Sequence, residues 1–129
     1  MSANKDLYDR GLATRREVLG DEYVDRALEQ ATAFSAPFQE LVTEYCWGAV
    51  WGRPGLDRRT RSLINIGMIS ALNRPKELTT HLRAALRNGC TPEEIREALL
   101  QTAIYCGVPA ALDGFRLAED VLDEAEAEG

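Results

Sequence analysis

The feature that most constrains this fold is a succession of segments with helical periodicity, separated by glycine and proline. No run alternates apolar and polar residues as a strand does. A first helix is expected over about residues 7–19, ending at Gly20, and a second over about 22–32. Ser35 is placed to cap a third, which runs to about residue 51. This pattern predicts an all-α bundle of about six or seven helices.

The fourth expected helix has the sequence DRRTRSLINIGMISALN, with Asp57 placed to cap it after the helix-breaking segment GRPGL. Its apolar residues wrap most of the circumference, so we expect a central helix that is buried on nearly all sides. They are Leu63, Ile64, Ile66, Met68, Ile69 and Leu72. Arginines crowd its start and oppose the helix dipole, which favours a bound anion there. A solvated, salt-bridged helix start is the alternative.

The only histidine, His81, lies on the next expected helix, which Pro75 opens and Gly89 ends in a left-handed turn. Glu77 stands four residues earlier on the same face, where its carboxylate can orient or charge the imidazole. The ring flanks the apolar stripe of that helix, so it is expected to point into the protein or a partner subunit. The stripe consists of Leu78, Leu82, Ala85 and Leu86. A core or interface histidine is the alternative to an acid/base role.

Two more helices are expected in the remaining chain. Thr91 and Glu94 form a capping box that opens a helix to about residue 105. The last helix covers about 109–124 and runs into an acidic tail that starts at about residue 119. With 129 residues, the chain is expected to form a single domain over 1–129.

Composition excludes several classes of protein. A net charge of -6 argues against a nucleic-acid binder, which needs a basic surface. The sequence has no signal-peptide core and no run of about 18 apolar residues, so no membrane association is expected and the cytoplasm is the default. Cys46, Cys90 and Cys106 show neither CxxC nor metal-ligand spacing. We expect small core residues there, with no disulfide framework and no metal site.

Four segments carry a resemblance to a known family. They are RREVLG (15–20), WGAVWGRPGLDRRTRSL (47–63), ALNRPKELTTHLRAALRNGCTPEEI (71–95) and YCGVPAA (105–111). The chain resembles the carboxymuconolactone decarboxylases, and the second segment is typical of that branch. The wider superfamily includes alkylhydroperoxidase D-like proteins, which carry a CxxC pair before the histidine. Arg74 and Glu77 occupy those positions here, so thiol peroxidase chemistry is not expected.

The resemblance implies a single-domain helical bundle of the alkylhydroperoxidase D-like type. It implies conversion of 4-carboxymuconolactone to 3-oxoadipate enol-lactone and carbon dioxide, without cofactor or metal, in protocatechuate catabolism by the β-ketoadipate pathway. The substrate is a dianionic lactone, for which arginines are natural receptors. The resemblance also implies a homo-oligomer built on trimers, commonly a hexamer, with sites near subunit contacts.

The implied reaction assigns roles to particular residues. Loss of carbon dioxide leaves an enolate that needs charge stabilisation and a proton on carbon. His81 is the expected proton donor, oriented by Glu77, and Arg58 with Arg61 is expected to bind the two carboxylates. Further substrate-binding candidates are Trp47, Trp51, Arg53, Arg74 and Tyr105. Core packing is an alternative for both tryptophans, as is helix-end packing for the tyrosine. Two other functions stay open: a lyase or isomerase of a related lactone, and a non-catalytic binding module.

Overall fold

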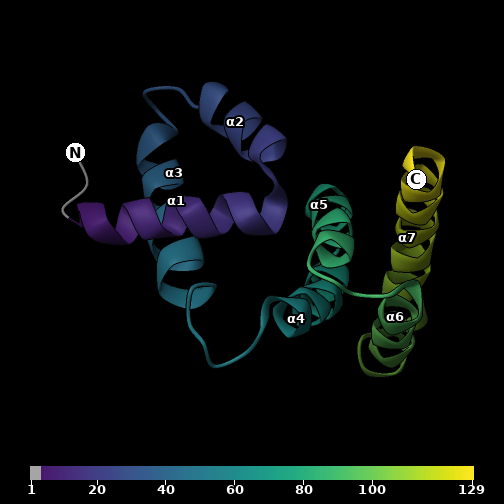
Figure 1. The fold of residues 1–129 in the computed structure, drawn as a ribbon. Coiled ribbons are helices and arrows are strands. Elements are labelled where there is room, and N and C mark those ends of the chain that lie inside the picture. The colour runs from purple at the N-terminus through teal and green to yellow at the C-terminus, as the bar shows by residue number, and fades with distance from the viewer. Residues whose placement is uncertain (1–3) are drawn as a thin grey trace. The chain divides into compact units, whose positions relative to one another are not determined.

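The computed structural model describes residues 4–129, which form seven α-helices, one π-helix and no strand (Figure 1). The all-α prediction is confirmed. The elements are α1 (Lys5–Leu19), α2 (Asp21–Glu29), α3 (Ala36–Leu41), η1 (Val42–Val50), α4 (Arg58–Leu72), α5 (Pro75–Arg87), α6 (Pro92–Cys106) and α7 (Val108–Glu128). They form two compact units that meet in sequence between Asp57 and Arg58. The single domain over 1–129 stays a prediction.

The first unit is built on the packing of α1 against η1. Two glycines permit the close approach of these helices. A Cβ added to Gly11 would lie 2.9 Å from the backbone nitrogen of Gly48, and one added to Gly48 would lie 2.8 Å from the carbonyl oxygen of Leu7. Both distances are shorter than real Cβ contacts, so a larger side chain at either position would push the helices apart.

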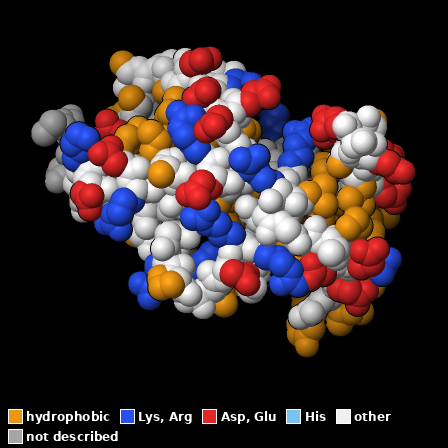
Figure 2. Space-filling view, in the orientation of Figure 1, with side chains coloured by type: hydrophobic (Ala, Val, Ile, Leu, Met, Phe, Trp, Pro, Cys, Tyr) orange, Lys and Arg blue, Asp and Glu red, His pale blue; other side chains and the backbone are white. Residues whose placement is uncertain are grey.

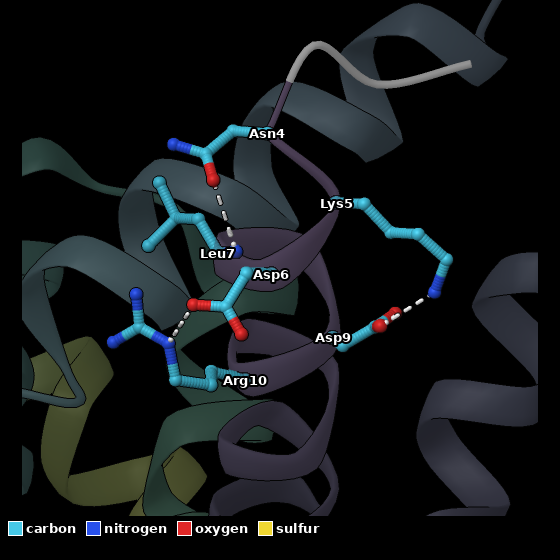
Figure 3. A network of polar contacts seen from close by, with 6 residues as sticks. All are labelled: Asn4, Lys5, Asp6, Leu7, Asp9 and Arg10. Atoms are coloured by element: carbon cyan, nitrogen blue, oxygen red, sulfur yellow. Dashed lines mark hydrogen bonds and ion pairs between the residues drawn. The ribbon is translucent and has the colours of Figure 1, made fainter.

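The first turn of α1 is stabilised by polar contacts within the helix (Figure 3). The Asn4 side chain accepts a hydrogen bond from the Leu7 backbone N–H at 3.2 Å, which caps the helix. Ion pairs with i,i+4 spacing join Lys5 to Asp9 at 2.7 Å, and Arg10 to Asp6 at 3.2 Å. Both pairs are exposed to solvent, so they support the first turns of α1 only weakly.

The third expected helix is six residues of α-helix followed by a π-helix, which the apolar pattern did not predict. The Trp51 N–H donates to the carbonyl oxygen of Cys46 at 2.9 Å, five residues back. The Thr43 hydroxyl donates to the carbonyl oxygen of Gln39 at 2.7 Å, which competes with the α-helical ladder where the π-helix begins. Ser35 does not cap with its side chain, because its hydroxyl accepts the Thr32 N–H at 2.8 Å.

The second unit contains α4, α5, α6 and α7 around an apolar core. Its most buried side chains are Ile66, Leu82, Ile95 and Leu99. The predicted capping box is confirmed, because the Thr91 hydroxyl accepts the Glu94 N–H at 3.1 Å and the Glu94 carboxylate accepts the Thr91 N–H at 2.9 Å. Gly89, which follows the C-cap residue Asn88 of α5, has a φ of 96°, as predicted for a left-handed cap.

Helix α4 is buried on one side only, so the prediction of burial on nearly all sides is wrong for the part of the chain described. Ser62, Ile66 and Ser70 face the core, each less than 3% exposed. Ile64 and Met68 are 44% and 52% exposed. The neighbouring helices α5, α6 and α7 cover only part of the circumference. Among the described residues, none of the helices is long and apolar enough to cross a membrane.

Candidate functional site

His81 lies on α5 beside the buried Leu82, and its ring is part-buried, as predicted from the apolar stripe. Burial lowers the pKa of the His81 imidazole, because desolvation disfavours the charged ring, while the charge of Glu77 acts in the opposite direction. Glu77 therefore favours the protonated ring, as predicted, but desolvation outweighs it. The carboxylate lies exposed in the first turn of α5. The lowered pKa favours the neutral imidazole.

The ring of His81 has a neighbour that the sequence reasoning missed. Asn65 lies on α4, and its side-chain nitrogen Nδ2 is 3.4 Å from Nδ1 of His81. Helical spacing could have identified Asn65, because it follows Arg61 by four positions and Arg58 by seven and so lies on the same face of the helix. The contact links the histidine helix to the arginine-rich helix.

Arg58 and Arg61 stand in the first turn of α4, and both are partly buried. Their spacing to Asn65 places all three on one face of the helix. At a rise of about 1.5 Å per residue, Arg61 starts roughly 6 Å and Arg58 roughly 10 Å along the axis from Asn65. The structure thus brings the two predicted carboxylate receptors to the side of α4 that contacts His81.

Arg59, between those two arginines, has a different environment. Its guanidinium forms an ion pair with Glu94, the acid of the capping box, and its Nε donates to Oε1 of that carboxylate at 3.2 Å. The side chains are 43% and 26% exposed, so the pair is partly shielded from solvent. Arg59 therefore fixes the start of α6 to α4. Arg59 thus belongs to the contact between α4 and α6, whereas Arg58 and Arg61 lie on the face of α4 that carries Asn65.

The other candidates are distributed over both units. Trp47 and Trp51 belong to the first unit, where their ring centroids lie 5.2 Å apart at an interplanar angle of 33°. They are only 4% and 6% exposed, which is typical of aromatic core packing. Arg53 is exposed in the segment after η1, and Arg74 is exposed at the N-terminal boundary of α5.

Tyr105 lies in the wall of an apolar groove of about 660 Å³ between α4 and α6. The lining residues are Leu63, Ile64, Gly67, Met68, Glu93, Glu94, Glu97, Ala98, Gln101, Thr102, Tyr105 and Cys106. Tyr105 is 83% exposed, so the alternative of packing at a helix end is wrong for the described chain. Figure 2 shows further hydrophobic side chains where α6 turns into α7. The described residues that line this groove do not include His81 or Asn65.

The three cysteines are free thiols in three different environments. Cys90 is buried, as predicted, and burial raises the pKa of the partly buried Cys46 thiol, which makes it less reactive. Cys106 is exposed at the last position of α6, so its prediction as a core residue is wrong. Residues 4–129 contain no cluster of three or more His, Cys, Asp or Glu side chains that could hold a metal ion.

Comparison with known proteins gives consistent matches. Residues 36–120 match the model of the Carboxymuconolactone decarboxylase family, and this range includes parts of both units. The chain is similar to 4-carboxymuconolactone decarboxylase from Acinetobacter baylyi, with 44% identity over 94% of this chain and 90% of that protein. It is also similar to nitrosuccinic acid decarboxylase from Metarhizium robertsii, with 44% identity over 98% of this chain and 88% of that protein. A 4-carboxymuconolactone decarboxylase from Pseudomonas putida is 48% identical over 34% of this chain and 92% of its own length.

Proposed function

Because this chain belongs to the carboxymuconolactone decarboxylase family, we propose that it converts 4-carboxymuconolactone to 3-oxoadipate enol-lactone and carbon dioxide. The observation that carries the proposal is the face of α4 that presents Arg58, Arg61 and Asn65, with His81 against it. Two fixed positive charges on the face of α4 that contacts the imidazole suit a dianionic lactone. We place the reaction in cytoplasmic protocatechuate catabolism, with no cofactor and no metal.

The chemistry explains why such a site needs no electron sink of its own. When the ring carboxylate leaves as carbon dioxide, the electron pair of the broken C–C bond runs through the double bond to the lactone carbonyl. The resulting enolate takes one proton on carbon, so each turnover consumes one proton from solvent. The protein has to stabilise the charge on the lactone oxygen and deliver that proton to carbon.

We assign His81 to proton delivery, with Glu77 and the bound dianion favouring its charged form when substrate is present. Arg58 and Arg61 are assigned to the carboxylates. An arginine that gripped the leaving carboxylate would stabilise the ground state more than the transition state, so one of the pair should hold the acetate arm. Substrate-binding roles are also proposed for Arg53, Arg74, Tyr105 and, as apolar walls, Trp47 and Trp51.

A second substrate is favoured by one specific observation. The nitrosuccinic acid decarboxylase from Metarhizium robertsii matches 98% of this chain, at the same 44% identity as the lactone enzyme from Acinetobacter baylyi. Nitrosuccinic acid also carries two carboxylates, one of them next to an electron-accepting group. Its decarboxylation makes the same demands on the site: anion binding, stabilisation of a delocalised carbanion and protonation on carbon. The same residues are also compatible with a lyase or isomerase reaction on a related lactone and with a non-catalytic binding role.

The experiment that tests this proposal is direct. Purified protein in the presence of a chelator is given freshly generated 4-carboxymuconolactone or nitrosuccinate, and carbon dioxide and the organic product are followed against the uncatalysed rate. Faster turnover of the lactone supports the proposal, and turnover of nitrosuccinate alone would replace it. Arg61→Gln should lower kcat/KM by about 10-fold or more, since a charge-assisted contact contributes roughly 1.5–3 kcal/mol. Arg83→Gln, which removes an exposed arginine paired with Glu124, is the matched control and should retain activity.

We also propose that the chain forms a homo-oligomer, built on trimers and commonly a hexamer. The apolar groove between α4 and α6 supports self-association, because large contiguous apolar surfaces exposed to water often mark interaction sites. Ile104 and Tyr105 are 81% and 83% exposed, and Met68 in the same groove as Tyr105 is 52% exposed. Met68→Glu should reduce the mass measured by sedimentation. An unchanged mass would show that this groove lies outside the subunit contacts.

A further inference from the structure

We propose that Asn65 is a positioning residue, whose side-chain amide holds His81 with its proton on Nε2. This inference rests on the proposed function, because it specifies which nitrogen of His81 delivers the proton. It begins with the 3.4 Å contact between Nδ2 of Asn65 and Nδ1 of His81. An amide nitrogen can only donate a hydrogen bond, since its lone pair is delocalised into the carbonyl. With the amide in the orientation observed, Nδ2 towards the ring, Nδ1 accepts and the proton of the neutral ring lies on Nε2.

The two helices hold this contact in place. Asn65 is followed by Ile66, which has no exposed surface, so the backbone of α4 is fixed at this point by the core. His81 lies between Leu78 and Leu82, which are 2% and 1% exposed and anchor the same turns of α5. Tight packing of this kind restricts rotation of the flanking side chains. The ring is thus held by the core beneath it and by the amide of Asn65.

The choice of asparagine matters for the reaction. While the ring is neutral, the amide N–H groups can donate to Nδ1. When substrate is bound and a solvent proton adds to Nδ1, rotation of the amide presents its oxygen to the new N–H. The imidazolium then transfers its Nε2 proton to the enolate carbon, which forms the C–H bond and leaves a neutral ring with its proton on Nδ1. Exchange with solvent restores the Nε2–H form. An aspartate would instead favour a proton on Nδ1 throughout.

The test uses nitrogen NMR of the intact protein, in which His81 gives the only imidazole signals because the chain has one histidine. Long-range proton–nitrogen spectra distinguish a protonated from an unprotonated Nδ1. We expect the wild-type neutral ring to be in the Nε2–H form. In Asn65→Asp the proton should lie on Nδ1, because the carboxylate can only accept. A wild-type ring with its proton on Nδ1, or an unchanged tautomer in Asn65→Asp, would overturn the inference.

Activity provides the second measurement. Asn65→Leu keeps the size of the side chain but removes the amide, and we expect kcat to fall by about 10-fold or more with little change in KM, because acid catalysis is impaired and not binding. Asn88→Ala is the matched control. It removes another amide contact to α4, since Asn88 Nδ2 donates to Ser62 Oγ at 3.0 Å, and it should leave both kcat and the tautomer unchanged.

The two measurements separate failure of this inference from failure of the proposed function. The NMR result does not require turnover, so it tests the Asn65 contact even if neither substrate reacts. If the lactone is converted but Asn65→Leu retains the wild-type kcat, the positioning role is wrong and the decarboxylase assignment stands. If neither variant folds, Asn65→Gln provides the comparison, because it keeps the amide and displaces it by one methylene. Because the amide is kept, Asn65→Gln should retain the Nε2–H tautomer and more activity than Asn65→Leu, and a ring with its proton on Nδ1 would contradict the positioning role.

Discussion

The close packing of α6 against α7 predicts that Gly114→Ala destabilises the wild-type protein but stabilises a variant in which Leu99 has been replaced by alanine. Gly114 is a buried glycine in the interior of α7. A Cβ added there would lie 2.6 Å from Cδ2 of Leu99 on α6 and 3.3 Å from Oγ of Ser70 on α4. Leu99 has no exposed surface, so it has no solvent space to move into. The Ser70 hydroxyl is buried and has no hydrogen-bond partner among the described residues, so it can rotate at little cost.

Two opposing effects determine how much Gly114→Ala changes the free energy of unfolding. Alanine in place of glycine in a helix interior stabilises by about 0.5–1 kcal/mol. Overpacking of a well-filled core destabilises by about 1–3 kcal/mol. Gly114→Ala should therefore lower the free energy of unfolding by about 1 kcal/mol in the wild-type protein. Leu99→Ala alone should lower it by about 2–5 kcal/mol because it opens a cavity. In that background the new methyl group meets open space, and Gly114→Ala should now stabilise by about 0.5–1 kcal/mol.

Denaturant unfolding followed by circular dichroism measures all four members of this double-mutant cycle. Gly67→Ala is the matched control, because Gly67 lies in the interior of α4 and a Cβ there would meet only Thr102 Oγ1, at 3.5 Å. It should stabilise the protein in both backgrounds. If Gly114→Ala has the same sign with and without Leu99, the close contact between α6 and α7 does not limit the packing of this unit, and the reasoning is refuted.

Two further predictions concern His81. Glu77→Gln should lower the pKa of His81 further, because the Glu77 charge is the influence that raises it, and NMR titration of the single imidazole will measure the shift. An unchanged or higher pKa would contradict the assigned electrostatic role. Because burial holds the folded-state pKa of His81 below its value of 6.5, the unfolded chain binds the proton more readily. The resulting stability is fully present above about pH 6.5 and is lost as the pH falls towards the folded-state pKa. His81→Leu should therefore lose less stability than the wild-type protein over that range in denaturant unfolding, and an equal loss would argue against desolvation of the ring.

Most of the fold was predictable because its signals are local. The capping box of Thr91 and Glu94 is a short-range pattern, and the structure confirms it. The left-handed turn at Gly89 depends on one residue type and is also confirmed. By contrast, the π-helix of η1 depends on the Thr43 hydroxyl bonding a backbone carbonyl, and α- and π-helices carry similar apolar patterns over nine residues.

Burial of α4 was harder to predict, because an apolar circumference says nothing about how many neighbours a helix has. The pattern correctly identified Ile66 as core. It gave Met68 the same expectation, yet Met68 lines the groove between α4 and α6 and is 52% exposed. Periodicity shows which residues favour burial, but whether they are buried depends on which helices pack alongside.

The same distinction explains why the site was predicted only in part. His81, Glu77 and the pair of Arg58 and Arg61 could be proposed from the sequence because each relation lies within one helix, where spacing determines the face. The contact between Asn65 and His81 joins two helices, and it depends on how α4 and α5 are aligned along their length. A shift of α5 by one turn, about 5.4 Å, would bring Glu77 or Ala85 to the place where His81 meets the amide. The sequence therefore supplies the reactive groups, and the packing of Ile66, Leu78 and Leu82 determines which of them meet.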